Sequence, residues 1–351
     1  MSADKIDFVI TWVDGNDPNW RADKHRFEKS MSNPSYNCPV QSIGQEDAND
    51  ECRFRELGFL RYWFRAVEQC APWVNKIHFV TCGQKPDWLD EMHPKLNLVN
   101  HRDYIPEEYL PTFNSNTIEL NYHRIKGLSE HFVAFNDDMF LIQPIAPSFF
   151  FQDGNPLLDS NLRYPRIPHA NTINRIKFNN YVLINNHFNT RESIWSNRRK
   201  WFSVSDLGLK RARINLTCFL ANKTIPVGMY GHLGMPHLKS SFEEAWATEF
   251  QTMDETSRCR FRSDTQINHW MLCAWNQAKG HFSPTLASKM GLHIDISPDS
   301  IGFLIHCIKN KSFPQLCIND TRYNTEAEIS AVSIIEALDS IYPNKSGFEK
   351  Y

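Results

Sequence analysis

The hydrophobic positions along this chain follow two patterns in alternation, one typical of buried strands and one typical of helices. Runs of β-branched and aromatic residues predict strands at residues 6–13 (IDFVITWV), 76–82 (KIHFVTC) and 96–100. Between the first two runs, apolar residues recur at helical spacing over residues 57–67, and Pro72 closes that segment. The first part of the chain therefore predicts a strand, a helix and two further strands.

A second helix and a central strand complete this series. The helix is predicted to start at a capping box of Asn116 with Glu119, and the strand is the apolar run that ends in Asn136-Asp137-Asp138. This order of elements is typical of a parallel α/β sheet with right-handed crossovers. We therefore expect an α/β protein with a Rossmann-like, mostly parallel sheet and helices on both faces.

The two adjacent carboxylates after the central strand are the first indication of chemistry. Because burying an uncompensated charge is costly, Asp137 and Asp138 should meet a cation, a solvent cleft or strong hydrogen-bond donors. Mg²⁺ takes carboxylate oxygens and usually accompanies a phosphorylated substrate. The alternative is an ordinary turn, because Asn and Asp often end a strand without any further role.

Polar residues follow the other predicted strands as well. Asp14, Gln84 and Asp103 each come after a strand, and ligands bind at the carboxyl ends of strands in open α/β sheets. Near the C-terminus, a short strand at residues 316–318 ends close to Asp320. We expect these side chains to converge on one edge of the sheet, with Asp320 completing a set of carboxylates around one ion.

Two long segments give weaker patterns. Residues 21–50 are polar and predict a mobile loop or lid, and residues 149–202 belong to a less regular insertion. Basic residues cluster at 198–200 and at 210–213. Such a cluster is usually a solvated face. The alternative is a clamp for phosphate oxygens or for an anionic polymer.

Two histidines, His232 and His237, flank a Gly/Pro turn ahead of a helix that Ser241 and Glu244 are predicted to cap. A helix N-terminus lowers the pKa of a nearby histidine, which keeps the ring neutral and available as a base. The alternative for either residue is a structural hydrogen bond to a backbone carbonyl.

Composition limits the partners and the location. A chain of 351 residues can form one large domain or two, and its net charge of −2 gives no electrostatic case for binding nucleic acid. An aromatic share of 13% permits carbohydrate binding, since aromatic rings stack on sugars as well as filling cores. No apolar run reaches the roughly 18 residues of a membrane helix. The N-terminus shows no signal-peptide core, so a cytoplasmic protein is expected.

Missing motifs narrow the class of enzyme. The sequence contains no GxGxxG, GxxxxGK[ST], GxSxG or HExxH, the usual markers of dinucleotide oxidoreductases, P-loop kinases, α/β-hydrolases and zinc proteases. The 9 cysteines form no CxxC pair, so their spacing indicates neither a zinc knuckle nor a disulfide framework.

Segments from four parts of the chain resemble, in order, the conserved regions of the Stealth family. This family comprises bacterial capsular and exopolysaccharide hexose-1-phosphate transferases and the catalytic subunit precursor of the lysosomal-enzyme GlcNAc-1-phosphotransferase. The matching residues are 6–15 in the first region; 60–62, 71–74, 79–81, 83–84, 110–115, 118–119, 124–125 and 136–138 in the second; 235–237, 260–262 and 264 in the third; and 317–320 in the fourth. Phe59 stands where some relatives carry Glu, and the long inserted domains of the lysosomal enzyme are missing.

The resemblance implies a single catalytic domain over residues 1–351 that transfers a sugar-1-phosphate. It would comprise an N-terminal α/β half at 6–145, an irregular insertion or lid at 146–230 and a C-terminal half at 231–351. The donor would be a UDP-sugar, the acceptor a hydroxyl of an oligosaccharide or polysaccharide, and the cofactor Mg²⁺ or Mn²⁺. The product would be a phosphodiester linkage in a capsular or exopolysaccharide.

The resemblance also implies roles for individual residues, and their chemistry fits. Seven residues are expected at the reaction centre. Asp138 and Asp320 would bind the metal, with Asp137 as a further ligand, and His237 is the first choice for the base, with Glu119 the second. Arg262 would bind the phosphoryl oxygens, and Asp14 the nucleotide or the sugar. Seven more are expected to bind substrate: Trp12, Arg61, Arg65, Gln84, Thr112, Asn114 and His232.

Two other functions stay open at this stage. A metal-dependent glycosyltransferase would use the same acids but attack C1 of the sugar and release a nucleoside diphosphate. A non-catalytic carbohydrate-binding protein would rely on the aromatic residues. The sequence also leaves open which sugar is transferred, whether the acceptor is lipid-linked, whether the protein attaches to the inner face of the cell membrane, and which oligomeric state it adopts.

Overall fold

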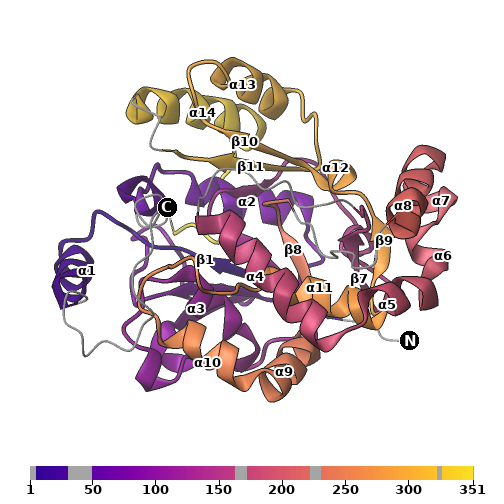
Figure 1. Ribbon diagram of the computed structural model, residues 1–351. Coiled ribbons are helices and arrows are strands. Elements are labelled where there is room, and N and C mark those ends of the chain that lie inside the picture. Colours follow the sequence, from indigo (N-terminus) through magenta and orange to yellow (C-terminus); the bar gives the residue numbers. More distant parts are fainter. Residues whose placement is uncertain (1–4, 31–49, 163–171, 222–230, 322–325, 351) are drawn as a thin grey trace.

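The computed structural model describes residues 5–30, 50–162, 172–221, 231–321 and 326–350 (Figure 1). At its centre lies a five-stranded sheet in the order β3-β2-β1-β4-β8. The strands are β1 (Ile6–Thr11), β2 (Ile77–Thr81), β3 (Leu96–Asn100), β4 (His131–Asn136) and β8 (Met235–Leu238). The first four run parallel to one another, and β8 pairs with β4 in the antiparallel sense. The predicted α/β fold with a mostly parallel sheet is confirmed.

The inner strands are covered on both faces, which explains their unbroken apolar sequences. Phe8 and Ile10 of β1 contribute to one hydrophobic core, whereas Val9, between them, contributes to a second core on the opposite face. Every residue of β2 is buried. Strands buried on both faces have near-continuous apolar runs instead of an apolar and polar alternation.

Helices form the covering layers. One face of the sheet is covered by α2 (Leu60–Cys70), whose Trp63 and Phe64 are fully buried in the first core. Among the helices that contribute to the second core are α3 (Ser115–Leu120), α9 (Lys239–Thr248), α10 (Phe250–Arg258) and α11 (Trp270–Lys279). The expectation of helices on both faces is therefore confirmed.

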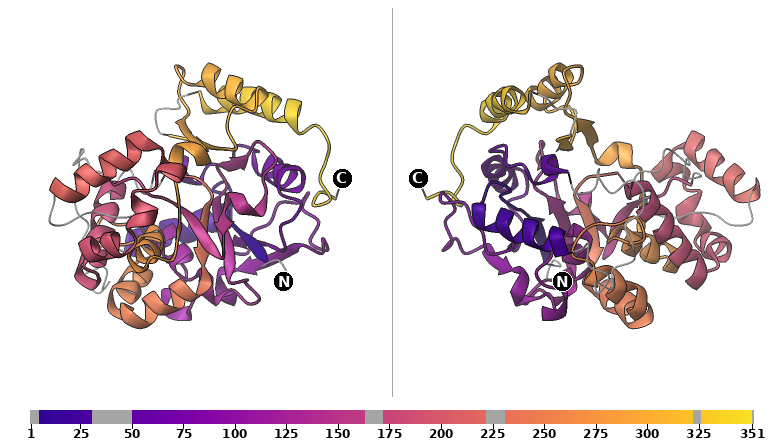
Figure 2. Two further views of the ribbon diagram at one scale, coloured as in Figure 1. Left: turned by 90° about the vertical axis from the view of Figure 1, so that its right-hand side faces the viewer. Right: turned by 60° about the vertical axis from the view of Figure 1, so that its left-hand side comes forward.

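Two smaller sheets extend the structure. The first joins the parallel strands β10 (Leu292–Asp295) and β11 (Gln315–Asn319) and pairs β11 antiparallel with β5 (Met139–Leu141). Helices α13 (Ile301–Lys309) and α14 (Ala327–Ile341) lie side by side over this sheet (Figures 1 and 2). The other small sheet contains β6 (Phe151–Gln152), β7 (Asn155–Asp159) and β9 (Ser283–Thr285). The remaining short elements are α12 (Ala287–Met290) and the 3-10 turns Glu51–Phe54, His101–Asp103, Glu107–Tyr109, Tyr122–Arg124 and Pro147–Phe149.

The insertion between β7 and β8 is helical where the structure describes it, so the prediction of an irregular segment was wrong over these residues. Its helices are α4 (Thr172–His187), α5 (Thr190–Ser196), α6 (Arg198–Trp201), α7 (Val204–Leu207) and α8 (Leu209–Ala221). Residues 163–171 and 222–230 lie outside the described part of the chain. In Figure 1, helices α5 to α8 lie at the opposite side of the molecule from α1.

The polar segment after β1 also differs from its prediction. Residues 21–30 belong to a helix, α1 (Pro18–Ser30), which starts with a proline at its first position, where the missing N–H is not needed. The predicted loop at 21–50 was therefore wrong over this part. Residues 31–49 lie outside the described part of the chain.

The structure also corrects two predicted helix caps. Asn114, not Asn116, caps α3, and its side chain accepts a hydrogen bond from the Asn116 N–H. Helix α9 starts at Lys239 without a side-chain cap, so Ser241 does not have that role.

Two properties of the described residues bear on the sequence analysis. Cys259, directly after α10, is disulfide-bonded, which the spacing of the cysteines did not indicate. Within the described ranges, no helix combines the length and the apolar character that a membrane crossing requires.

Arg65 on α2 anchors the C-terminal segment and does not face a binding site. Its side chain is 6% exposed and donates to both carboxylate oxygens of Glu349, at 2.8 and 2.9 Å, and to the Tyr342 carbonyl at 3.0 Å. Burial alone would raise the pKa of Glu349, but the hydrogen bonds from Arg65 and Ser346 lower it. The predicted substrate-binding role of Arg65 is therefore corrected to a structural one.

Replacing Arg65 by Met should lower the free energy of unfolding by about 3 kcal/mol, because the buried Glu349 carboxylate would lose its cation. Urea denaturation near neutral pH measures this difference. The pKa of Glu349 in the folded state lies below its ordinary value of 4.5. The ion pair therefore stabilises the fold fully above pH 4.5, and the difference between wild type and variant should shrink as the pH falls further.

Arg61→Met is the matched control on the same helix. Arg61 is half-buried, with its guanidinium 5.6 Å from the centroid of the Trp88 ring, so this change should cost about 1 kcal/mol or less. Equal losses for the two variants would contradict the structural role of Arg65.

Candidate active site

A cavity of about 230 Å³ opens where β1 and β4 end. The two strands finish level with each other, because Thr11 pairs with Asn136, and both residues line the cavity. Seven of the predicted site residues also line it: Trp12, Thr112, Asp137, Asp138, His232, Arg262 and Asp320. The parallel register thus brings the loops after β1 and β4 to one edge of the sheet, as expected for this class of fold.

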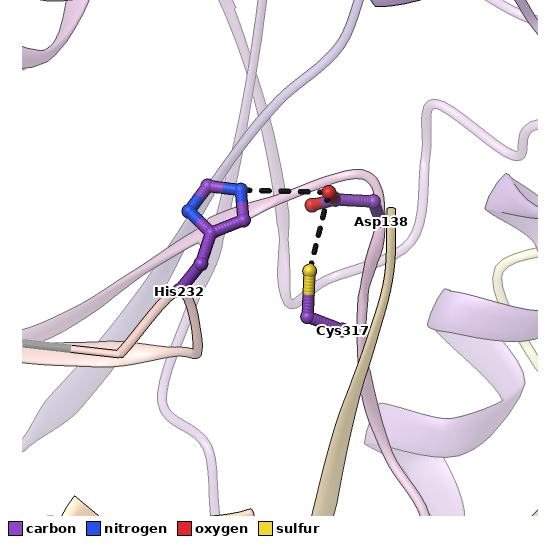
Figure 3. A group of neighbouring side chains, drawn as sticks. All are labelled: Asp138, His232 and Cys317. Atoms are coloured by element: carbon purple, nitrogen blue, oxygen red, sulfur yellow. Dashed lines mark hydrogen bonds and ion pairs between the residues drawn. The ribbon is translucent and has the colours of Figure 1, made fainter. Parts of the chain in front are cut away.

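Asp138 lies in the turn between β4 and β5 and lines the cavity. Its Oδ2 atom is 3.4 Å from Nε2 of His232 and accepts a hydrogen bond from the Cys317 thiol at 3.3 Å (Figure 3). Its other oxygen, Oδ1, is buried and has no hydrogen-bond partner among the described residues. Burial alone would raise the pKa of Asp138, but the charge and hydrogen bond of His232, with the Cys317 bond, lower it.

Asp137 has the opposite electrostatic behaviour. Burial, together with the negative charges of Asp138 and Glu56, raises its pKa well above the ordinary range. The neighbours of Asp138 therefore favour its anion, whereas the surroundings of Asp137 disfavour a second negative charge beside it.

Asp320 reaches the same cavity from the C-terminal part of the chain. It follows β11, and the backbone N–H of Ile318 donates to the Asp138 carbonyl at 2.8 Å. Its Oδ2 atom accepts a hydrogen bond from Nη1 of Arg55 at 2.9 Å. The structure therefore brings together two carboxylates that are far apart in sequence, and it places an arginine beside one of them.

Glu56 is a cavity residue that the sequence analysis missed. Its carboxylate accepts hydrogen bonds from the indole N–H of Trp12 and from the Gly58 N–H. Burial, opposed only in part by these bonds, raises its pKa. No sequence pattern indicated Glu56, because it lies in an irregular link ahead of α2 and not at the end of a strand.

Arg262 supplies a positive charge to the same cavity. Its guanidinium donates to the Ser115 hydroxyl at the start of α3. The surrounding loops are joined by a backbone hydrogen bond from Phe113 to Arg260 of 2.8 Å, which holds Arg262 beside the cavity. A planar guanidinium in this position can bind two phosphoryl oxygens at once.

Besides Arg65 and the two predicted bases, four predicted site residues do not line the cavity. Gln84 holds the loop after β1, because its amide accepts from the Asp14 N–H at 2.9 Å and donates to the Asp14 carbonyl at 3.0 Å. The Asp14 carboxylate accepts from the Asn16 N–H within the same turn. Asn114 caps α3, and Arg61 packs on Trp88. These contacts are structural, so the geometry gives no support to a substrate-binding role for any of them.

The two predicted bases also lie away from the cavity. His237 is in β8, not at a helix N-terminus, and it is fully buried, with its ring centroid 5.2 Å from that of His269. Burial and the nearby His269 lower the pKa of His237 well below its ordinary value. Glu119 accepts a 2.6 Å hydrogen bond from Nδ1 of His269. These two roles gain no support from the structure, because both side chains are enclosed by other groups.

The cavity residues fit a divalent cation of the hard type. Four carboxylates line it, from Glu56, Asp137, Asp138 and Asp320, and one buried oxygen of Asp138 has no partner among the described groups. Asp138, His232 and Cys317 each offer one ligand atom within 4.8 Å of the others. Burial and Asp138 raise the pKa of Cys317 well above its ordinary value, which keeps the thiol protonated and disfavours it as a ligand.

Fold and cavity together define an α/β protein with an acidic, arginine-bearing pocket at the carboxyl edge of a parallel sheet. Residues 4–32 match the family model described as "Stealth protein CR1, conserved region 1", and residues 53–157 match "Stealth protein CR2, conserved region 2".

Similar proteins extend this match over the whole chain. The chain is 40% identical to a capsular polysaccharide phosphotransferase WcwK of Streptococcus pneumoniae, over 99% of this chain and 100% of that protein. It is 37% identical to the receptor polysaccharide phosphotransferase WefC of Streptococcus gordonii, over 99% of both chains. The chain belongs to the Stealth family, as its sequence motifs indicated.

Glu119→Gln tests whether the buried pair of Glu119 and His269 has a structural role. The change should lower the free energy of unfolding by about 1–3 kcal/mol, because the buried His269 ring loses its charged acceptor. Chemical denaturation measures this loss, with the exposed Glu336→Gln on α14 as a matched control. Unchanged stability together with lost turnover would instead favour the predicted catalytic role of Glu119.

Proposed function

We propose that this chain is a phosphotransferase that moves a sugar-1-phosphate from a UDP-sugar to a sugar hydroxyl, forming phosphodiester linkages in a capsular or related surface polysaccharide. Its full-length relatives are named capsular and receptor polysaccharide phosphotransferases, which supports this proposal. The observation that carries it is the gathering of Asp137, Asp138 and Asp320 with Arg262 and Arg55 in one cavity. Transfer of a phosphoryl group depends on such positioned charges.

The proposed reaction breaks one phosphorus–oxygen bond and forms another. The acceptor hydroxyl attacks the phosphorus next to the sugar, and the nucleoside monophosphate leaves. The bond between C1 of the sugar and its oxygen is not broken, so the anomeric configuration is retained. Arg262 is the group that binds oxygens of the phosphorus under attack, because it lies in the cavity and bears a fixed positive charge.

Three carboxylates would hold a divalent cation, Mg²⁺ or Mn²⁺. Asp138 and Asp320 are the principal ligands in this proposal, with Asp137 beside them, since all three line the cavity. When bound, the cation supplies charge neutralisation for the diphosphate.

Glu56 replaces His237 and Glu119 as the proposed base. Its carboxylate lines the cavity, two hydrogen bonds fix its orientation, and burial raises its pKa above the ordinary value. A carboxylate with these properties can accept the proton of the acceptor hydroxyl, a contribution of about 10²–10⁴ in rate. A location at the inner face of the cell membrane is part of the same proposal.

A donor labelled on the phosphate next to the sugar tests the reaction type. With a panel of UDP-sugars and an oligosaccharide acceptor, the label should appear in a phosphodiester product, and unlabelled nucleoside monophosphate should be released. Label in nucleoside diphosphate would contradict the proposal and indicate an ordinary glycosyltransferase. No turnover with any donor, in a protein that still binds oligosaccharide, would contradict it in favour of a binding protein.

Asp138→Asn and Glu56→Gln should separate cation binding from proton transfer. Asp138→Asn removes a proposed ligand, so Mn²⁺ affinity should fall about tenfold or more and turnover should be lost. Glu56→Gln should keep Mn²⁺ affinity within a factor of about three, while turnover falls about 10²-fold or more. Calorimetric titration with Mn²⁺ and the labelled-donor assay provide the two measurements.

The exposed Asp87→Asn is the matched control for both variants and should change neither quantity. The thermal midpoint of Asp138→Asn should stay near that of the wild type. A large fall in that midpoint would mean that the carboxylate pair is structural, which contradicts its proposed role.

A further inference from the structure

The helical insertion carries the basic clusters that the sequence analysis singled out and that the cavity does not use. None of the residues lining the cavity belongs to helices α4 to α8. Figures 1 and 2 show α5 to α8 grouped together at one side of the molecule, away from β1. These helices therefore present a surface of their own.

This surface is strongly positive in a chain that is slightly negative overall. Residues 172–221 contain nine Lys and Arg but only two acidic residues, Glu192 and Asp206, whereas the whole chain has a net charge of −2. Arg198, Arg199, Lys210 and Arg213 are all exposed. A local excess of this size attracts anionic partners.

An apolar stripe runs along the exposed face of α8. Leu209, Leu216 and Leu220 are 52%, 41% and 68% exposed, and their spacing of seven and four residues places them on one side of the helix. Arg213 falls within the same stripe by its spacing, and the adjoining side of the helix buries Phe219. Leucines exposed in such a row need a partner that offers an apolar environment.

An exposed tryptophan of α5 packs on the adjoining side of α8. Trp195 is 54% exposed and stacks on Phe219 of α8, with ring centroids 5.8 Å apart. The guanidinium of Arg198 lies 5.4 Å from the centroid of the same tryptophan ring. The surface therefore combines leucine, tryptophan and arginine side chains, the composition typical of helices that lie in a membrane interface.

We propose that the face formed by α5, α6 and α8 docks on the surface of a membrane that contains anionic lipids. Lipid headgroups pair with the basic side chains, and the leucines and the indole enter the boundary between headgroups and acyl chains. An anionic polysaccharide could pair with the arginines, but it would leave the leucine stripe in water. A dimer in which two copies of the chain pair through this face would bring two strongly positive surfaces together, which is unfavourable.

Flotation of the full chain with lipid vesicles tests this proposal without reference to the enzymatic reaction. The protein should float with vesicles of phosphatidylcholine containing about one third phosphatidylglycerol, and much less with phosphatidylcholine alone. Binding should weaken when the salt concentration is raised, because screening reduces the electrostatic attraction.

Two sets of substitutions identify the face. Leu216→Gln with Leu220→Gln should weaken vesicle binding about tenfold. Arg199→Gln, Lys210→Gln and Arg213→Gln together should weaken it about 30-fold or more. The matched controls change exposed residues elsewhere: Ile329→Gln with Val332→Gln on α14, and Arg102→Gln, Lys126→Gln and Lys309→Gln. The controls should bind vesicles as the wild type does.

Three results would overturn the proposal. The first is equal binding by the test variants and their controls. The second is failure to float with anionic vesicles while heparin, a soluble polyanion, retains the chain through the same basic residues, which would assign the face to an anionic polymer. The third is failure to float together with dimer formation that the leucine substitutions abolish, which would assign it to a second copy. Circular dichroism of each variant verifies that the fold is kept.

Discussion

The antiparallel pairing of β5 with β11 is the contact on which the cavity depends. Cys317 pairs with Met139 and Leu316 with Phe140, and the side chains of Leu316 and Phe140 are fully buried. Burying side chains of this size stabilises a fold by about 1.5–3 kcal/mol each. This pairing holds Asp320, two residues beyond Ile318, near the turn that carries Asp138. Hydrophobic packing of the two strands therefore sets the distance between two carboxylates from distant parts of the chain.

The sequence was sufficient to predict the four parallel strands of the central sheet. It was not sufficient to predict β8, where a Gly/Pro turn was expected, or the insertion. Strands such as β1 are buried on both faces, and their apolar runs are therefore unbroken and easy to recognise. Helices α4 and α8 expose apolar residues as well as burying them: Phe178 and Val182 on α4 and Leu220 on α8 are exposed. Apolar residues on both sides remove the contrast on which recognition of an amphipathic helix depends. Exposed apolar residues made these helices difficult to predict, and on α8 such residues form part of the proposed docking face.

The candidate site was predicted only in part, because a polar residue with a structural role looks the same in the sequence as one in a binding site. Asp138, Asp320 and Arg262 could be named because acids and arginines near strand ends and loops are rarely there for packing alone. Gln84 and Arg65 have the same polar character, but they are used by backbone groups and by Glu349, which only the folded chain reveals. Glu56 had no sequence signal, because its position depends on the path of the chain ahead of α2.

The charges of the cavity constrain how a substrate can enter it. Burial and neighbouring carboxylates raise the pKa of Asp137, and burial raises that of Glu56, so these two carboxylates are not fully compensated by the arginines that line the cavity. A bare diphosphate would add further negative charge and be repelled. A diphosphate that carries a divalent cation brings compensating charge to these same carboxylates. The electrostatics of the cavity therefore favour a donor that binds together with its cation over one that binds alone.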